Sequence, residues 1–204
     1  MIKYLPLAKF TMTSRHQNEI AERIASHLKA LRKSRSLSLD KTAQLTGVSK
    51  AMLGQIERGE SSPTIATLWK IATGLSASFS SFITPSVGAT PHSKQVEENR
   101  FSNDPNMDVK TLFPYDALTQ FEVFSLVLKN RHEQHSTAHQ IGVTERIHVT
   151  KGCLSVLQNG EWTSLKEGEQ CVLNADQAHG YKDEVGETHF IAVIHYPNGT
   201  ETVA

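Results

Sequence analysis

The sequence predicts an α + β protein of two domains, a bundle of five short helices followed by an antiparallel β-barrel. Up to about Leu75, apolar residues recur at three- and four-residue steps, as on the buried face of a helix. Beyond residue 110 they alternate with polar residues, as along a strand with one buried face. Residues 1–90 contain 12 Lys and Arg against 5 Asp and Glu, and residues 91–204 contain 9 against 16. This asymmetry indicates two domains with different partners, the basic one facing a polyanion.

The helical domain is predicted over residues 16–83, and the first 15 residues are expected to form an extended arm. A first helix carries one apolar stripe, which consists of Ile20, Ile24, Leu28 and Leu31. Capping residues mark the helices that follow. Ser38 begins a second helix that Gly47 ends, Ser49 begins a third over 50–57, Ser62-Pro63 begins a fourth through Ile71, and residues 79–83 form a fifth.

The β part is predicted over residues 111–204, after a linker at 84–110. The linker is expected because prolines and a glycine lie there among serine, asparagine and charged residues. Asn159-Gly160 is a strong hairpin signal. Alternation predicts strands at 121–129, 144–150, 153–158, 162–165, 170–174 and 188–196. Many short strands without helices between them indicate an antiparallel sandwich or barrel.

Composition indicates a cytoplasmic protein. No run approaches the roughly 18 apolar residues of a membrane span. The first 35 residues lack the apolar segment of a secretory signal. Cys153 and Cys171 have no second pair that would complete a zinc site, so we expect them to be small buried residues in a reducing compartment.

The segment from Leu37 to Leu75 carries the most informative pattern. Gly47 can take the positive φ of a tight turn between helices, and Ser49 caps the helix after it. Together with Ala43, the run Gln55-Ile56-Glu57-Arg58-Gly59, Pro63, Leu68 and Ile71-Ala72, the segment resembles the Xre, or Cro/C1-type, helix-turn-helix transcription regulators. The resemblance implies that the helix at 50–57 reads base edges in the major groove of double-stranded DNA.

This resemblance also implies the DNA-contacting residues. Val48, Leu53 and Ile56 should seat the helix at 50–57 on the core, which leaves Lys50, Ala51, Gly54 and Gln55 outside. Gln suits adenine, Lys suits guanine, and the Ala methyl suits thymine. Helix N-termini and nearby cations should contact phosphates, although any single cation could instead be a solvated surface charge. The predicted DNA-binding residues are Ser38, Lys41, Ser49, Lys50, Ala51, Gln55, Arg58 and Ser62.

In the same family an arginine of the first helix pairs with a glutamate near the end of the third. Arg32 and Glu57 occupy these places, so we expect them to form a structural pair rather than to contact DNA.

The β part resembles the cupin barrel over roughly residues 120–200. His139, Glu145 and Gly152 follow the family's first motif, with Ile141 where a second histidine would stand. Gly168 and His179 follow the second motif, in which Asn174 and Asp176 replace a proline and a glycine. Complete cupins hold a divalent metal through three histidines and one carboxylate. The resemblance therefore implies a site for zinc, or for another first-row metal, at His139, Glu145 and His179.

Alternation refines this site. Glu145, Ile147 and Val149 share one face of their strand, so an inward Glu145 turns His148 outward and excludes it as a ligand. Ile147 and Val149 are then expected to hold the side chain of a bound small molecule. Two alternatives stay open for the three metal-ligand candidates, which could instead hydrogen-bond a ligand directly or have a structural role.

A helix-turn-helix joined to a cupin resembles bacterial one-component regulators whose barrel binds a metabolite and dimerises. We therefore expect a sequence-specific transcription regulator, not an enzyme, that binds an inverted-repeat operator as a homodimer under the control of a small-molecule effector. The helical part looks closest to members tied to sulfur-compound utilisation, which points to a sulfur-containing amino acid. The alternatives are a metal-dependent dioxygenase or isomerase that carries the helical domain, and a constitutive repressor that uses the barrel only to dimerise.

Overall fold

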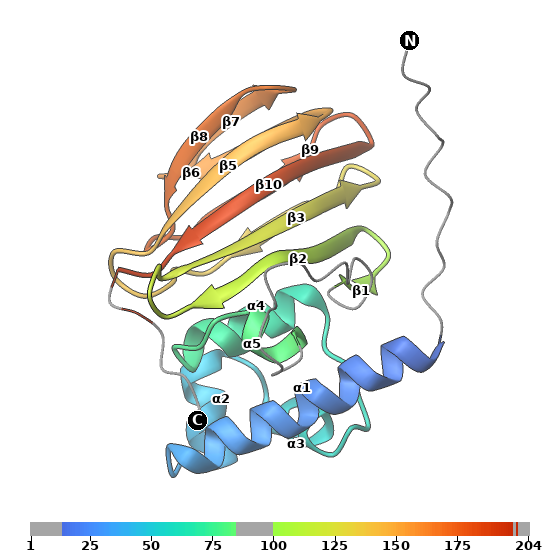
Figure 1. Cartoon of the computed structure of the whole chain (residues 1–204), viewed down its shortest axis with the longest axis vertical. Helices are drawn as coiled ribbons and strands as arrows, with labels where there is room; N and C mark the ends of the chain where they lie inside the picture. Colours follow the sequence, from blue (N-terminus) through green and yellow to red (C-terminus); the bar gives the residue numbers. More distant parts are fainter. Residues whose placement is uncertain (1–13, 85–99, 198, 200–204) are drawn as a thin grey trace.

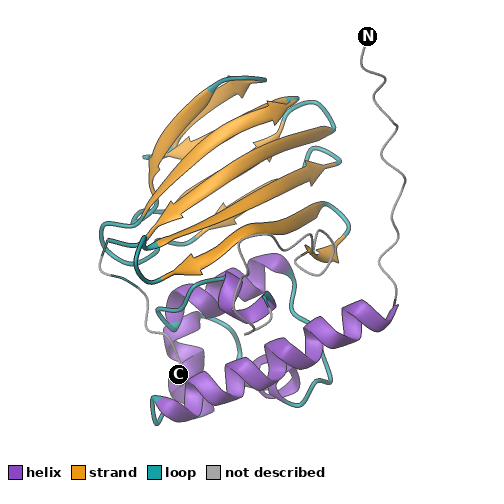
Figure 2. Cartoon of the chain, in the orientation of Figure 1, coloured by secondary structure: helices purple, strands orange, loops and turns teal. Residues whose placement is uncertain are grey.

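The computed structural model describes residues 14–84, 100–197 and 199. The predicted N-terminal arm up to residue 13 and residues 85–99 of the predicted linker lie outside this range. In the described part, helices form one layer and two β-sheets lie above it (Figures 1 and 2). None of these helices is long and apolar enough to cross a membrane.

The helices of the described residues match the predicted bundle. They are α1 (Ser14–Ser34), α2 (Leu39–Thr46), α3 (Lys50–Glu57), α4 (Ile65–Gly74) and α5 (Ser80–Ile83). The predicted stripe of α1 is buried, with Ile24 and Leu28 at 0% exposure. Ser38 and Ser49 cap α2 and α3 by accepting from the backbone N–H of Lys41 and Met52. Gly47 ends α2 at a φ of 66°, which a side chain would disfavour.

The predicted start of the fourth helix was wrong. Thr64, not Ser62, is the N-cap of α4, and its hydroxyl accepts from the backbone N–H of Thr67. Pro63 therefore precedes the cap instead of opening the helix. Any of several hydroxyl residues in the run from Ser61 to Thr64 can cap a helix, so composition alone does not select among them.

The β part is antiparallel, as predicted, and its two sheets pack face to face as a cupin-like sandwich whose sheets do not close into a barrel. The larger sheet has the order β1-β2-β3-β10-β5-β8 and the smaller one β4-β9-β6-β7. The strands are β1 (Arg100–Asp104), β2 (Met107–Asp116), β3 (Phe121–Lys129), β4 (Glu133–Ser136), β5 (Thr144–Lys151), β6 (Cys153–Gln158), β7 (Glu161–Lys166), β8 (Gln170–Asn174), β9 (His179–Asp183) and β10 (Glu187–His195).

All six predicted strands are present within one residue of their predicted ends, and Asn159-Gly160 forms the β6–β7 turn with positive φ at both residues. Residues 100–110, which we predicted as the end of the linker, instead form β1 and the start of β2. Asp108 explains the error. This buried carboxylate pairs with Arg100 at 2.8 Å and with Lys129 at 2.5 Å, so charged residues stand where a strand pattern would show apolar ones.

The helical layer packs on the sandwich through α4 and α5. Trp69 of α4 stacks on Phe79 with ring centroids 4.2 Å apart, and Phe79 meets Phe124 of β3 edge-on at 5.6 Å. Glu122 of β3 is fully buried there; its carboxylate accepts from the backbone N–H of Phe79 and Ser80 and from the Tyr196 hydroxyl. Buried apolar residues consequently form one continuous core through both parts.

Candidate DNA-binding surface and metal site

The outer face of α3 carries the residues that we predicted to read bases. Lys50, Ala51 and Gln55 are exposed, whereas Leu53 and Ile56 are buried at 0% and 1% exposure. Gly54, which we expected on the outer face, is buried instead. A Cβ there would lie 3.2 Å from the Arg58 guanidinium and 3.9 Å from Leu39. The exposed surface of α3 is therefore narrower than predicted, and Met52, at 38% exposure, adds to it.

The cationic side chains around α3 differ in whether they form an ion pair with an acidic side chain. Lys41 is exposed at the beginning of α2, next to the Ser38 cap. Lys50 pairs with Asp40 at 2.8 Å on the surface. Arg58 follows α3 as its C-cap, and Glu60 binds its guanidinium with two contacts of 2.7 Å. Ser62 is exposed but caps no helix, because that role belongs to Thr64.

Arg32 and Glu57 form a two-pronged ion pair between α1 and α3, in the arrangement implied by the family resemblance. Arg32 Nε lies 2.5 Å from Glu57 Oε1, and Arg32 Nη2 lies 2.8 Å from Glu57 Oε2. Arg32 Nη1 also donates to the carbonyl of Leu37 at 2.9 Å. The hydrogen bond with Glu57 raises the pKa of the Arg32 guanidinium. Through this ion pair, both side chains fix the position of α3 against α1.

His139, Glu145 and His179 converge inside the sandwich. His139 lies in the loop between β4 and β5, Glu145 on β5 and His179 at the start of β9. His139 Nε2 lies 3.0 Å from Glu145 Oε1, and His179 Nε2 lies 3.5 Å from the same oxygen. One ligand atom from each side chain lies within 4.8 Å of the others. Their side chains are 8%, 4% and 1% exposed.

The donor atoms of this cluster suit a divalent cation. His179 Nδ1 lies 2.8 Å from the Gln177 carbonyl, to which it donates. That bond leaves Nε2 as a lone-pair donor in the neutral ring, aimed at Glu145. Among the described residues, His179 Nε2 is buried without a hydrogen-bond partner. A lone pair facing a carboxylate calls for a cation between them, either a proton or a metal ion, and two imidazoles with one carboxylate are a donor set that zinc accepts.

The pKa values reflect the same mutual attraction. Burial alone would raise the pKa of the Glu145 carboxyl, but the hydrogen bond with His139 and the charge of both imidazoles lower it overall. Burial alone would lower the pKa of His179, but the charge of Glu145, whose Oε1 lies 3.5 Å from Nε2, and the hydrogen bond to the Gln177 carbonyl raise it overall. The Tyr181 hydroxyl donates to Glu145 Oε2. Burial and the charge of Glu145 raise the pKa of Tyr181 well above its ordinary value. Glu145 is therefore ionised and positioned to bind a cation.

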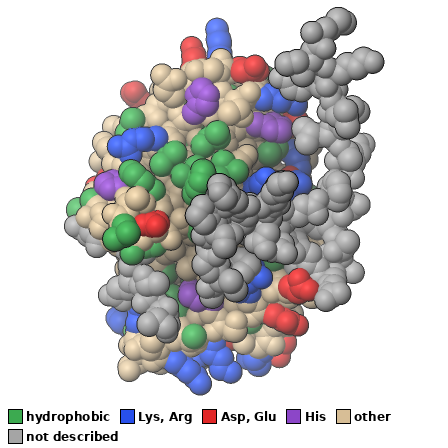
Figure 3. All heavy atoms as spheres, viewed as in Figure 1, with side chains coloured by type: hydrophobic (Ala, Val, Ile, Leu, Met, Phe, Trp, Pro, Cys, Tyr) green, Lys and Arg blue, Asp and Glu red, His purple; other side chains and the backbone are tan. Residues whose placement is uncertain are grey.

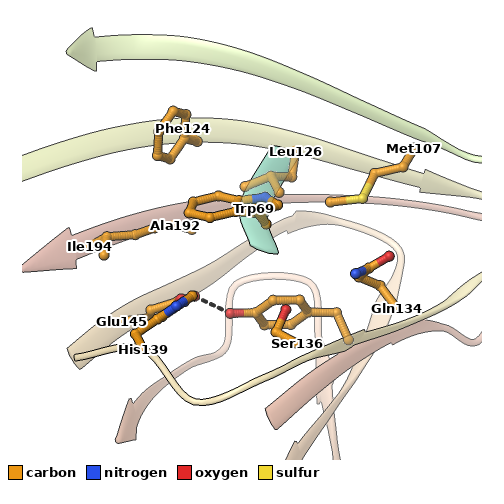
Figure 4. Close-up of a pocket in the computed structure, with 11 residues that line it drawn as sticks. Trp69, Met107, Phe124, Leu126, Gln134, Ser136, His139, Glu145, Ala192 and Ile194 are labelled. Atoms are coloured by element: carbon orange, nitrogen blue, oxygen red, sulfur yellow. Dashed lines mark hydrogen bonds and ion pairs between the residues drawn. The ribbon is translucent and has the colours of Figure 1, made fainter. Parts of the chain in front are cut away.

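A pocket opens beside the cluster (Figure 4). Its polar side consists of Gln134, Ser136, His139, Glu145 and Tyr181, and its apolar side of Trp69, Met107, Phe124, Leu126, Ala192 and Ile194. Ile147 and Val149 share the inward face with Glu145, as predicted, but they are fully buried in the sandwich core and do not line the pocket.

The alternation along β5 is as predicted, with His148 exposed on the opposite face from Glu145. Sequence reasoning missed Trp69, and it placed Tyr181 only among aromatic residues of the core or the mouth of the β part, without its hydrogen bond to Glu145. A signal for Trp69 was available, because it is a large aromatic residue beside the Leu68, Ile71 and Ala72 stripe of α4 rather than on it. Tyr181 lies two residues after His179 and therefore on the same face of β9.

Fold and site together define a helix-turn-helix domain joined to a cupin-type sandwich, and comparison with known proteins agrees. Residues 28–82 match the helix-turn-helix family HTH_3. The HTH-type transcriptional regulator SutR of Escherichia coli (strain K12) is 45% identical over 179 residues, which is 87% of this chain and 97% of that protein. An HTH_3 family transcriptional regulator from Vibrio cholerae has a crystal structure that is 49% identical, covers 89% of this chain and 99% of its own, and superimposes with a TM-score of 0.80.

A crystal structure of the Cupin_2 domain of an XRE family transcriptional regulator from Enterobacter cloacae is 35% identical over 46% of this chain and 99% of its own, with a TM-score of 0.44. The matches to SutR and to the Vibrio cholerae regulator both span the helical and the β part. The chain belongs to the HTH_3, or Xre-type, family of helix-turn-helix transcriptional regulators.

Proposed function

We propose that this regulator binds an inverted-repeat operator as a cytoplasmic homodimer, and that a small molecule bound beside His139, Glu145 and His179 controls its affinity for DNA. The observation that carries the proposal is the separation of two polar sites in one packed chain. One is exposed on a capped helix and suits a nucleic acid, and the other is buried around a pocket and suits a small ligand.

DNA reading is assigned to Lys50, Ala51 and Gln55. Ser38, Ser49 and Lys41 bind phosphate, since two are helix caps and one is a free-standing exposed cation beside them. Arg58 joins them only by exchanging Glu60 for a phosphate, and Ser62 acts only as a surface hydroxyl.

The test of DNA reading begins by selecting an operator from a random duplex pool. Gln55→Ala should weaken binding to that operator by about 1–3 kcal/mol and relax selectivity at one position. Lys41→Ala should weaken all sequences alike and lower the salt dependence. Equal losses on operator and random DNA for Gln55→Ala would remove the base-reading role.

The homodimer is assigned to the outer face of the larger sheet. Hydrophobic side chains gather on this face in Figure 3. Phe113, Phe121 and Val172 are exposed there by 67%, 38% and 59%. A two-fold axis through such a face would pair it with itself and present two copies of α3 to successive turns of DNA, about 34 Å apart. Phe113→Asp should yield monomers in analytical ultracentrifugation and a footprint on a single half-site. A dimer that persists in this variant would move the interface elsewhere.

The metal is assigned to His139, Glu145 and His179, with zinc as the ion. When bound, zinc would supply open coordination positions and so a Lewis-acidic anchor for an effector's donor atoms. A sulfur-containing amino acid would present its amine and carboxylate to the metal, and its side chain to Met107, Leu126 and Ile194. The role is recognition and not turnover, because the attached domain reads DNA. These residues can also hydrogen-bond such a ligand without a metal, which is the competing arrangement.

The effector test compares operator affinity, zinc content and amino-acid binding in wild type, in His179→Ala and after chelation. We expect a sulfur-containing amino acid to change operator affinity only in the metal-loaded wild type. A full response of metal-free protein would exclude chelation and retain the sensor. Consumption of the amino acid by the purified protein would instead favour an enzyme, and the absence of any response would favour a constitutive repressor.

A further inference from the structure

We propose that Thr73 and Trp69 of α4 belong to the effector site, so that the DNA-binding domain itself supplies one wall of the pocket. This inference rests on the proposed sensor function and adds the route by which an occupant of the sandwich reaches α3. It assigns binding and positioning roles to two residues of the helical domain.

Thr73 holds His139 from the other domain. Its Oγ1 lies 2.9 Å from His139 Nδ1, while Nε2 of the same ring faces Glu145 at 3.0 Å. A neutral imidazole has one N–H and one lone pair, and a ring that binds metal through Nε2 must carry its proton on Nδ1. The hydroxyl of Thr73 can accept that proton's hydrogen bond, or donate when the proton is on Nε2. Thr73 therefore orients His139 in either tautomer, as partners of metal-ligating histidines do.

Trp69 closes the pocket one helical turn earlier. Its ring lies between the apolar residues of the larger sheet and the His139–Glu145 pair (Figure 4), with its centroid 5.8 Å from those of both Phe124 and His139. With Trp69 in this position, the free space in the pocket holds only about one or two water molecules. A ligand the size of an amino acid must displace the indole or shift α4.

A shift of α4 would be transmitted to the DNA-binding surface through Gly74, the residue that follows Thr73. Gly74 packs directly against the backbone at the end of α2, where a Cβ would collide with the Leu45 carbonyl and lie 2.6 Å from Thr46 Cα. No flexible side chain separates the two helices at this point. The end of α2 continues through Gly47 into the Ser49 cap of α3. Displacement of Thr73 and Trp69 is therefore passed by backbone contact to the turn that sets the position of α3.

The lining defines the ligand class as a small molecule with a polar, metal-binding end and a compact apolar end. The polar end meets His139, Glu145 and Tyr181, and the apolar end meets Trp69 and Met107. A second pocket between α4 and β4 is lined by Lys70, Gln134, Ser136 and Thr137 and extends the same wall towards solvent.

The experiment uses the full chain, with zinc as the probe. The chain has two tryptophans, so Trp162→Phe leaves Trp69 as the sole tryptophan emitter, and Trp162 lies on β7 outside the pocket lining. In this background we expect zinc to shift Trp69 emission and to change amide exchange at Leu45–Gly47. Thr73→Val should lower zinc affinity by about 10- to 100-fold and abolish the change at Leu45–Gly47. Thr73→Ser should restore both, because it keeps the hydroxyl.

Thr67→Val is the matched control, since it removes a hydroxyl from the same helix at its exposed N-terminal end. Equal zinc affinity in Thr73→Val and Thr67→Val, with Trp69 emission unmoved by zinc, would overturn the inference. If zinc binds neither variant nor wild type, the metal proposal fails separately. The metal-free proteins then decide, because Thr73→Val should raise amide exchange at Leu45–Gly47 roughly three- to tenfold above Thr67→Val. Unchanged exchange there would also overturn the inference.

Discussion

The two domains place their functional polar groups in opposite environments. In the helical domain, Lys50 and Gln55 stand exposed on a short capped helix, and the partly buried Arg32–Glu57 pair fixes that helix. In the sandwich, Glu145 and His179 are almost completely buried and directed at one another. Exposed polar groups contribute little to stability and are free to meet a polyanion. Buried ones interact strongly and must be satisfied by a partner, which is a demand that a ligand can meet.

The largest effect is expected from the buried cluster. His179→Ala removes one of three converging donors, so zinc affinity should fall by at least about 100-fold, beyond the loss typical of a partner of a ligand. His148→Ala is the matched control, because His148 lies exposed on the opposite face of β5 from Glu145. Isothermal titration with zinc measures both. Equal affinities would mean that burial in the sandwich does not mark a metal site.

The next largest effect is expected from the partly buried ion pair between Arg32 and Glu57. Glu57→Ala leaves the Arg32 guanidinium, 15% exposed, without its carboxylate. We expect a loss of about 2–3 kcal/mol in the free energy of unfolding, measured by urea denaturation. Glu60→Ala is the comparison, because its pair with Arg58 is on the surface, and it should change stability little. Similar losses in the two variants would remove the distinction between buried and exposed pairs.

A smaller effect is expected at Asp108. Burial by itself would raise the pKa of this carboxyl, but hydrogen bonds from Lys129 and Ser102 and the charge of Arg100 lower it overall. Because the folded pKa lies below the unfolded value, the stabilisation is present above an ordinary Asp pKa and is lost as the pH falls through the folded pKa. Asp108→Asn should lower the free energy of unfolding by about 1 kcal/mol at neutral pH, because its partners are partly solvated. It should also reduce the fall of this free energy at acidic pH, measured by urea denaturation at a series of pH values. An unchanged fall at acidic pH would contradict the assignment.

The smallest effect on stability is expected on α3. Gln55→Ala should change the free energy of unfolding by no more than about 0.5 kcal/mol, although the same change should weaken operator binding. Thermal unfolding compares it with wild type. A clear loss of stability would show that Gln55 supports the fold, and its effect on DNA would then need another explanation.

Local signals were sufficient for most elements, and the cupin motif was sufficient for the convergence of His139, Glu145 and His179. Caps and hairpin residues act within a few positions, so α2, α3 and the β6–β7 turn follow from Ser38, Ser49 and Asn159-Gly160. His139, Glu145 and His179 could be predicted because motif spacing places them, and the alternation along β5 turns Glu145 inward.

Contacts between distant segments could not be predicted in this way. Strand patterning does not say whether two sheets close on one another, so it left a sandwich and a barrel open. The hydrogen bond from Thr73 to His139 joins residues 66 positions apart. Ile147 and Val149 satisfied the alternation but lie deeper than the pocket, whose apolar wall comes from strands that pair only in the folded chain.

Glu122 bears on how the chain unfolds. Its carboxylate is held by two amides of the segment that begins α5, and burial raises its pKa in spite of the hydrogen bonds from Tyr196 and Ser80. If the helical layer came away, Glu122 would lose the two amide donors of Phe79 and Ser80, and the sandwich would expose the Phe124 face that Phe79 covers. We therefore expect each domain to be less stable alone than in the full chain. The two domains should therefore melt in one cooperative transition.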